Sequence, residues 1–190
     1  MCEQKNQSIS EFFDEIDNLL DLSGAAERAK LPVECFYPAM QTNIRHIETC
    51  LDKQLKILAV FAIQQADRHY SYRKQEQLSG NCPARYATRA RLSGKSLSCT
   101  WYYNGFIGGR EEGPYFKSLP KDRGRRYRER VFREAHLEER QLIDNIEQHY
   151  SHVCEAVELL KKQYRCLVQL DNLLQKSFIN HDPIADVKPD

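Results

Sequence analysis

Positive charge is concentrated in one part of this sequence, the stretch between Arg85 and Arg133. This stretch holds thirteen Lys and Arg residues but only four Asp and Glu residues, so its net charge is +9, while that of the whole chain is +1. The flanking sequence must therefore carry a net charge of about −8. Such a separation of charge is typical of a protein that binds a polyanion, most often nucleic acid. We therefore expect this stretch to bind nucleic acid.

The basic residues of this stretch suit two kinds of contact with DNA. Lys and Arg that neutralise phosphates release bound counterions, and Arg can also fork onto guanine edges in a major groove that admits a β-ribbon. Three arginines that share one face of a predicted strand are the predicted groove contacts: Arg85, Arg89 and Arg91. Five arginines that follow the strands are the predicted backbone contacts: Arg123, Arg125, Arg126, Arg128 and Arg130. Three lysines complete the predicted set: Lys95, Lys117 and Lys121.

The aromatic residues of the same stretch are open to two interpretations. Five of them could stack on unpaired bases: Trp101, Tyr102, Tyr103, Tyr115 and Phe116. The alternation along this run instead favours burial of Trp101 and Tyr103 in the core of a sheet. The arginines, in turn, could form a solvated face or pair with acidic residues of the flanking segments.

Catalytic and metal-binding patterns are weak in this sequence. His149 and His152 lie three residues apart, and Glu155 or Glu158 could add a carboxylate to a metal site, but a solvated helix face is the favoured interpretation. No phosphate-binding loop, serine-hydrolase elbow or zinc-protease motif occurs. A tyrosine nuclease or strand-transferase is the least favoured function, because no histidine cluster accompanies the ten tyrosines. We therefore expect a protein that is not an enzyme and uses no cofactor and no metal.

The cysteines do not predict a disulfide framework. There are seven of them, which is an odd number, and no two form a C-x-x-C pair. Reduced thiols that behave as small apolar side chains are favoured. A zinc site at Cys82 and Cys99 is a minor alternative, because their spacing is not that of a known zinc finger.

Two long helices are predicted on either side of the basic stretch, over residues 36–78 and 137–176. In the first, apolar residues recur every three or four positions, with Ile57 and Phe61 widening the stripe formed by Met40, Ile44, Ile47, Leu51, Leu55, Leu58 and Ala62. In the second they form a heptad seam: Ile146, Tyr150, Val153, Val157, Leu160, Tyr164 and Leu167. Helices of this length need a partner. We expect the two to pair as an antiparallel hairpin, although pairing between the subunits of a homodimer fits the same pattern.

Between the helices, residues 84–133 predict a small basic β-sheet. Three strands are expected, over residues 85–92, 96–103 and 115–119. Ser93-Gly94-Lys95 forms the turn between the first two strands. Asn104-Gly105 either forms a second tight turn or lies within an extended second strand. Residues 121–133 are expected to form a basic loop or the first turns of the second helix.

The two ends of the chain complete the predicted architecture. Residues 1–32 predict a short amphipathic helix, with capping-box spacing from Ser8 to Glu11, and a linker. Residues 177–190 predict a disordered tail. No apolar run is long enough for a membrane span or a secretory signal, so a cytoplasmic protein without membrane contact is expected. The predicted class is α+β: two long antiparallel coiled-coil-like helices carry a small basic antiparallel β-sheet head, with a short N-terminal amphipathic helix.

Three short motifs resemble those of MobI-type conjugative transfer proteins. They are SGKSLSCTWYYN from Ser93 to Asn104, YFKSLPK from Tyr115 to Lys121, and the pair Arg126-Tyr127. The resemblance spans about residues 85–160. It implies an accessory factor that helps to process the origin of transfer, with double-stranded DNA and a relaxase as partners, and not the relaxase itself. The alternative is a non-enzymatic adaptor or scaffold whose basic head binds an acidic protein partner.

Overall fold

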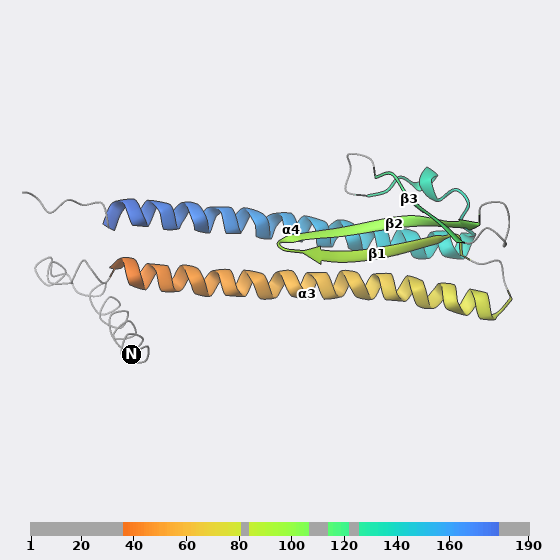
Figure 1. Cartoon of the computed structure of the whole chain (residues 1–190), viewed down its shortest axis with the longest axis horizontal. Helices are drawn as coiled ribbons and strands as arrows, with labels where there is room; N and C mark the ends of the chain where they lie inside the picture. Colours follow the sequence, from red (N-terminus) through yellow and green to blue (C-terminus); the bar gives the residue numbers. More distant parts are fainter. Residues whose placement is uncertain (1–35, 81–83, 107–113, 122–125, 179–190) are drawn as a thin grey trace, which may run out of the picture. The chain divides into compact units, whose positions relative to one another are not determined.

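Two long helices and a three-stranded antiparallel sheet make up the computed structural model of the chain, which describes residues 36–80, 84–106, 114–121 and 126–178 (Figure 1). The elements follow in the order α3 (Phe36–Leu78), β1 (Tyr86–Ser93), β2 (Ser96–Phe106), β3 (Pro114–Ser118), η3 (Glu129–Phe132) and α4 (Leu137–Phe178). The predicted α+β class is confirmed. The N-terminal helix predicted within residues 1–32 and almost all of the predicted tail lie outside the described residues. None of the described helices has a stretch long and apolar enough to cross a membrane.

The chain divides into two compact units. The first unit, Met1–Cys50 with Tyr164–Asp190, contains the first turns of α3 and the last turns of α4. Here the rings of Phe36 and Phe178 stack with their centroids 6.1 Å apart, and the Tyr37 hydroxyl donates to Asp171 Oδ1 at 3.4 Å. The second unit, Leu51–Gln163, contains the whole sheet and the remaining length of both helices. Every predicted nucleic-acid contact belongs to the second unit.

The heptad seam predicted for α4 is confirmed. All seven of its residues are buried, from Ile146 at 0% exposure to Leu167 at 9%. The helix begins at Leu137, as predicted, and ends at Phe178, two residues beyond the predicted end. Glu138 and Glu139 in its first turn and Lys176 in its last turn complement the helix dipole.

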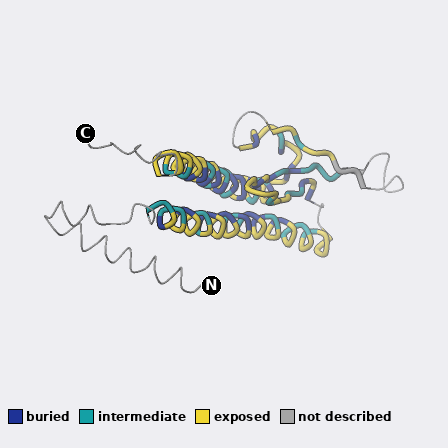
Figure 2. The backbone as a smooth tube through the Cα atoms, turned by 60° about the vertical axis from the view of Figure 1, so that its left-hand side comes forward, coloured by how far each residue is buried: buried dark blue, intermediate teal, exposed yellow. Residues whose placement is uncertain are grey.

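The stripe predicted for α3 is right in part. The helix has the predicted bounds, and Pro38 lies in its first turn, where a missing N–H breaks no helical bond. Its buried apolar residues are Ala39, Ile44, Leu51, Leu55, Ala59 and Ala62. Ile47 and Ile57 were expected to be buried, but they are 44% and 68% exposed. The helical turn carries the buried face through the small residues Ala59 and Ala62 instead and leaves the apolar Ile57 exposed. Buried and exposed positions alternate along the length of α3 (Figure 2).

Within the second unit, α3 and α4 pair with each other in antiparallel orientation. Arg68 Nη1 donates to Asn145 Oδ1 at 3.1 Å, and Phe61 meets His149 edge-on with ring centroids 5.4 Å apart. Positions later in α3 thus face positions earlier in α4. The helical hairpin therefore closes within one chain, as the first of the two predicted pairings has it.

The sheet has the order β1-β2-β3, with both pairs antiparallel. Ser93 pairs with Ser96, so Gly94 and Lys95 form a two-residue hairpin loop. Gly94 has a φ of +55°, a left-handed conformation that glycine adopts without the penalty of a Cβ. Of the two predictions for residues 104–105, the extended strand is correct, because β2 continues to Phe106. The third strand begins and ends one residue before the predicted bounds.

An aromatic core joins the sheet to the helices in the second unit. Trp101 is 0% exposed, and its ring meets those of His69 and Phe132 edge-on at centroid distances of 5.0 Å and 5.2 Å. Phe132 lies in η3, a single 3₁₀ turn, and a bend follows it before α4 begins. The described part of residues 121–133 is therefore a loop, and the alternative that it forms the first turns of α4 is wrong.

Candidate nucleic-acid interface

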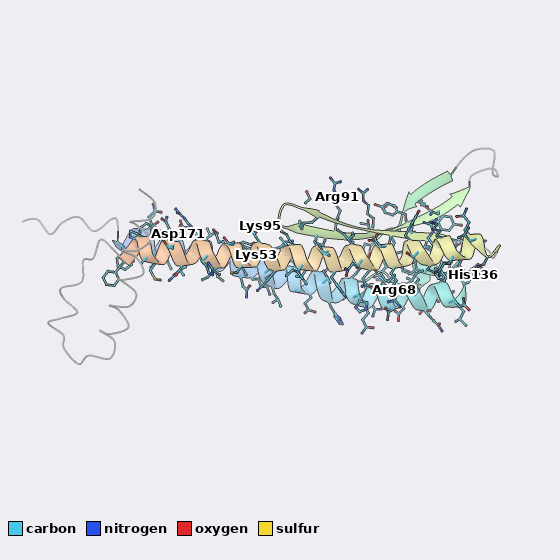
Figure 3. The ribbon with its side chains drawn as sticks, turned by 90° about the horizontal axis from the view of Figure 1, so that it is seen from below. Lys53, Arg68, Arg91, Lys95, His136 and Asp171 are labelled. Atoms are coloured by element: carbon cyan, nitrogen blue, oxygen red, sulfur yellow. The ribbon has the colours of Figure 1, made fainter. Side chains whose placement is uncertain are left out.

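The outer face of the β1–β2 hairpin carries two arginines beside a row of hydroxyl groups. Arg89 pairs with Thr100 and Arg91 pairs with Ser98 in the antiparallel register. Residues that lie directly opposite each other on antiparallel strands point to the same side of the sheet. The side chains of Arg89, Arg91 and Ser98 are exposed, and that of Thr100 is half-buried. Figure 3 shows Arg91 projecting from the hairpin on the side away from α3.

This outer face has no negative charge of its own. No Asp or Glu occurs in the sequence from Gln77 to Arg110, which includes the whole hairpin. Among the residues that the structure describes, the guanidinium groups of Arg89 and Arg91 have no hydrogen bond and no ion pair. Lys95 lies exposed in the hairpin loop and adds a third cation next to the same face. Arg89 and Arg91 therefore offer a polyanion positive charge that no carboxylate of the described residues neutralises.

The inner face of the hairpin is fixed to α4 by buried hydrogen bonds. Glu147 is 3% exposed and accepts hydrogen bonds from Trp101 Nε1 at 2.6 Å and from the Tyr127 backbone N–H at 2.7 Å. The Thr88 hydroxyl donates to the Tyr150 hydroxyl at 3.1 Å. Because these bonds hold the inner face, the arginines of the outer face stand on a rigid support, which lowers the ordering cost of binding.

A second buried carboxylate, Glu139, lies beside a buried histidine. Glu139 Oε1 accepts a hydrogen bond from the Tyr86 backbone N–H at 3.2 Å and lies 4.0 Å from His69 Nε2. Burial, and to a smaller extent the charge of Arg73, lowers the pKa of His69 to about 4. Burial also raises the pKa of Glu139. His69 is therefore neutral at pH 7, and its proximity to Glu139 is not an ion pair.

Sequence reasoning missed both buried carboxylates, although the sequence contains a signal for them. Glu139 and Glu147 lie four residues before and four residues after Ile143, on the face of α4 that becomes buried. A glutamate at such a position needs buried donors, and these come from Tyr86, Trp101 and Tyr127. The donors lie outside α4, so helical periodicity alone could not identify them.

Arg85 and Arg126, both predicted contacts, have acidic partners in the structure. Arg85 Nη1 lies 2.6 Å from Glu134 Oε2, and Arg126 Nη2 lies 2.6 Å from Asp144 Oδ1. The bond to Glu134 raises the pKa of Arg85, and Glu134 has a lowered pKa. Both pairs are exposed, and such pairs contribute only about 0–1 kcal/mol, so a phosphate can compete for either arginine.

The remaining predicted residues do not all share the outer face. Lys117 pairs with Tyr103 and so lies on the side of the sheet opposite Arg89. Lys121 lies 5.3 Å from the centre of the Tyr127 ring. Arg128 and Arg130 are exposed in the loop that leads through η3. Arg123 and Arg125 lie outside the described residues.

The described residues show no metal centre. No group of three or more His, Cys, Asp or Glu side chains among them is placed to hold a metal ion. His149 is half-buried against Phe61, and His152 is exposed. Cys82, one of the two cysteines of the minor zinc alternative, lies outside the described residues. Cys99 is buried and reduced.

The helical hairpin carries a sheet whose outer face holds Arg89 and Arg91 and whose inner face packs on an aromatic core, so the chain is an α+β protein. A comparison of the sequence with protein families gives a match to the family described as MobI protein, over residues 58–168, which is more than half of the chain. The chain belongs to the MobI family, as the resemblance over about residues 85–160 predicted. Membership relates it to conjugative mobilisation. Searches of curated proteins and of solved structures gave no match.

Proposed function

We propose that this chain is a non-enzymatic, DNA-binding accessory protein of conjugative transfer that acts in the cytoplasm at an origin of transfer, together with a relaxase. Membership of the MobI family supports the setting. The observation that supports DNA binding is the outer face of the β1–β2 hairpin, where Arg89 and Arg91 pair with no carboxylate of the part of the chain that the structure describes. Double-stranded DNA is the proposed ligand, because a two-stranded ribbon fits a major groove.

The spacing of the two arginines suits successive contacts along a duplex. Residues two positions apart on a strand are ~7 Å apart, which matches about two base-pair steps. Arg89 and Arg91 would contact base edges, because guanidinium groups fork onto guanine. The hydroxyls of Ser98 and Thr100 lie beside them in register, where they donate to the backbone oxygens of Arg91 at 3.3 Å and of Arg89 at 3.5 Å. A contact of either hydroxyl with a phosphate, which would position the protein without reading sequence, would have to replace one of these bonds.

The test is a titration of the full chain with duplex DNA from the origin of transfer, followed by fluorescence anisotropy at increasing salt concentration. The double variant Arg89→Ala/Arg91→Ala removes two cations from the outer face. Because both are proposed to contact base edges, preference for the origin over unrelated duplex should fall by about 1–3 kcal/mol for each lost contact. The slope of log affinity against log salt should change little, and a fall of about 2 would mean that both arginines contact phosphates instead. The matched control is Lys53→Ala/Lys56→Ala, which removes two exposed cations from α3 and should leave both quantities unchanged.

A second set of variants tests the division between groove and backbone contacts. Reversing the charge at Arg125, Arg126 and Arg128 to Glu should weaken binding to every DNA sequence by a similar factor. If these changes and those at Arg89 and Arg91 alter sequence preference alike, the proposed division is wrong. A wild-type chain that binds no DNA even at low salt would favour the adaptor function instead.

A further inference from the structure

A preformed pocket lies between the loop that precedes α4 and the first three turns of that helix. Its volume is about 340 Å³, which is at the small end of the range for ligand sites. The loop contributes Tyr127 and Phe132, and the helix contributes Ile143, all three less than 10% exposed. Leu137 also lines the pocket, and it is 71% exposed. Leu137 thus adds exposed apolar surface to the buried apolar lining of the pocket.

Both walls of this pocket are held by hydrogen bonds. The Tyr127 backbone N–H donates to Glu147 on α4, and Arg126 pairs with Asp144 on the same helix, so the loop is tied to the helix at two consecutive residues. Arg140 Nη2 donates to the backbone oxygen of Arg133 at 3.2 Å, which fixes the chain at the other end of the loop. Because these bonds already hold the pocket in shape, a ligand that binds there pays little conformational entropy for ordering it.

Charge around the pocket indicates what it binds. Three carboxylates line it, those of Glu129, Asp144 and Glu147, against two guanidinium groups, those of Arg126 and Arg140. This lining has no excess of positive charge, unlike the outer face of the hairpin. A nucleotide would bring its phosphate close to these carboxylates, whereas an apolar side chain of a protein brings no such charge. Mixed charges around an apolar centre are typical of a protein interface.

The geometry points to this pocket as the docking site for a protein partner that inserts one large apolar side chain between Phe132 and Leu137. The occupant is an exposed peptide segment with an aromatic or branched aliphatic residue flanked by charged residues that face Arg126 and Glu129. The inference does not depend on DNA binding at the outer face of the hairpin, with which the pocket shares no residue. Arg126 is the one residue that belongs both to the pocket lining and to the proposed backbone contacts.

The test uses random peptides displayed on phage and selected against the full chain, with the affinity of each enriched peptide measured by calorimetry. Enriched peptides should share one large apolar residue. The variant Gln141→Trp places a ring in the pocket and should weaken them by tenfold or more. Gln148→Trp, an identical change at an exposed position two turns further along α4, should have no effect.

A second measurement does not depend on how the Trp variants fold. In the wild-type chain with labelled methyl groups, adding an enriched peptide should shift the NMR signals of Leu137 and Ile143. Peptides that bind both Trp variants equally, or that leave these methyl signals in place, would overturn the inference. A second result would also overturn the inference: an oligonucleotide with unpaired bases that shifts the same methyl signals and binds the Gln141→Trp variant more weakly. The pocket would then be a site for a base and not for a side chain of a protein. Duplex DNA binding should be the same in all of these variants, so failure of this inference is distinguishable from failure of the proposed function.

Discussion

His69 is the residue whose protonation state the fold controls most directly. Because burial lowers its pKa from 6.5 to about 4, the unfolded chain takes up a proton on this residue at a pH where the folded chain does not. Protonation between these two values therefore favours the unfolded state. From about pH 7 to about pH 5, His69 alone should reduce the free energy of unfolding by about 2 kcal/mol. Urea denaturation at the two pH values measures this change.

Glu139 has the opposite effect on the same measurement. Its pKa is raised by burial, so the folded chain binds a proton on Glu139 more readily than the unfolded chain, and this contribution to stability grows as the pH falls. The variant His69→Gln separates the two, since it removes only the histidine contribution. Its stability should fall less than that of the wild type between pH 7 and pH 5. An equal fall in both proteins would show that His69 is accessible to protons in the folded state.

Cys99 and Cys154 form a contact between β2 and α4 that the sequence did not predict. A hydrogen bond from the Cys99 thiol lowers the pKa of Cys154 from its ordinary value of 9.0, and the same contact, together with burial, raises the pKa of Cys99. Cys154 should therefore react with iodoacetamide at a lower pH than a free thiol does, because the thiolate is the nucleophile. Peptide mapping by mass spectrometry at a series of pH values measures its rate.

The variant Cys99→Ala provides the control for this reaction. Without the donor, the pH profile of Cys154 alkylation should move towards higher pH. Cys166, which is exposed on the same helix, serves as an internal reference for the reagent. Identical Cys154 profiles in the variant and the wild type would exclude the proposed thiol contact.

At the scale of elements, Glu147 fastens both the sheet and the preceding loop to α4. Replacement by Ala leaves two buried donors, Trp101 Nε1–H and the Tyr127 N–H, without an acceptor. Each such loss costs about 1–3 kcal/mol, so Glu147→Ala should destabilise the fold by roughly 3 kcal/mol in urea denaturation. The emission of Trp101, the single tryptophan, should also move to longer wavelength. Glu158→Ala, an exposed glutamate on the same helix, should change neither by a comparable amount.

The regular elements could be predicted from the sequence because local periodicity determines them. The seam of α4 repeats every seven residues and was identified completely, and the hairpin follows from strict alternation around Gly94. The α3 stripe was assigned in part, since small residues such as Ala59 and Ala62 occupy the buried face while the larger Ile57 is exposed. The size of an apolar side chain on α3 is therefore a poor guide to whether that side chain is buried.

The site was predictable only where it depends on strand alternation. Arg89 and Arg91 were assigned to one face correctly, because the two-residue period of a strand fixes their side. The Arg85–Glu134 and Arg126–Asp144 pairs depend on contacts between distant segments, which no local pattern encodes. Likewise, the position of Lys117 depends on the register of β2 with β3, which cannot be read from the β3 sequence alone.

At the scale of the second unit, charge is divided between two surfaces. The outer face of the hairpin carries cations without carboxylates, whereas the pocket beside α4 is lined by both signs around an apolar centre. Only the first surface can gain affinity from the release of counterions, since that gain requires a polyanion. The second surface relies on burial of apolar area, which salt weakens little. Ionic strength should therefore distinguish the two binding reactions.

The full chain should bind duplex DNA and a pocket-binding peptide at the same time, with different responses to salt. Raising the salt concentration should reduce DNA affinity steeply and peptide affinity only slightly, and saturating DNA at low salt should leave the peptide affinity unchanged. Anisotropy of a labelled peptide, measured with and without DNA across a series of salt concentrations, tests both statements. Displacement of the peptide by DNA would mean that the two ligands share one surface, and a single salt dependence for both would mean that the pocket also binds through charge. Simultaneous binding would give the chain the two surfaces that an accessory protein needs to join a DNA site to a protein.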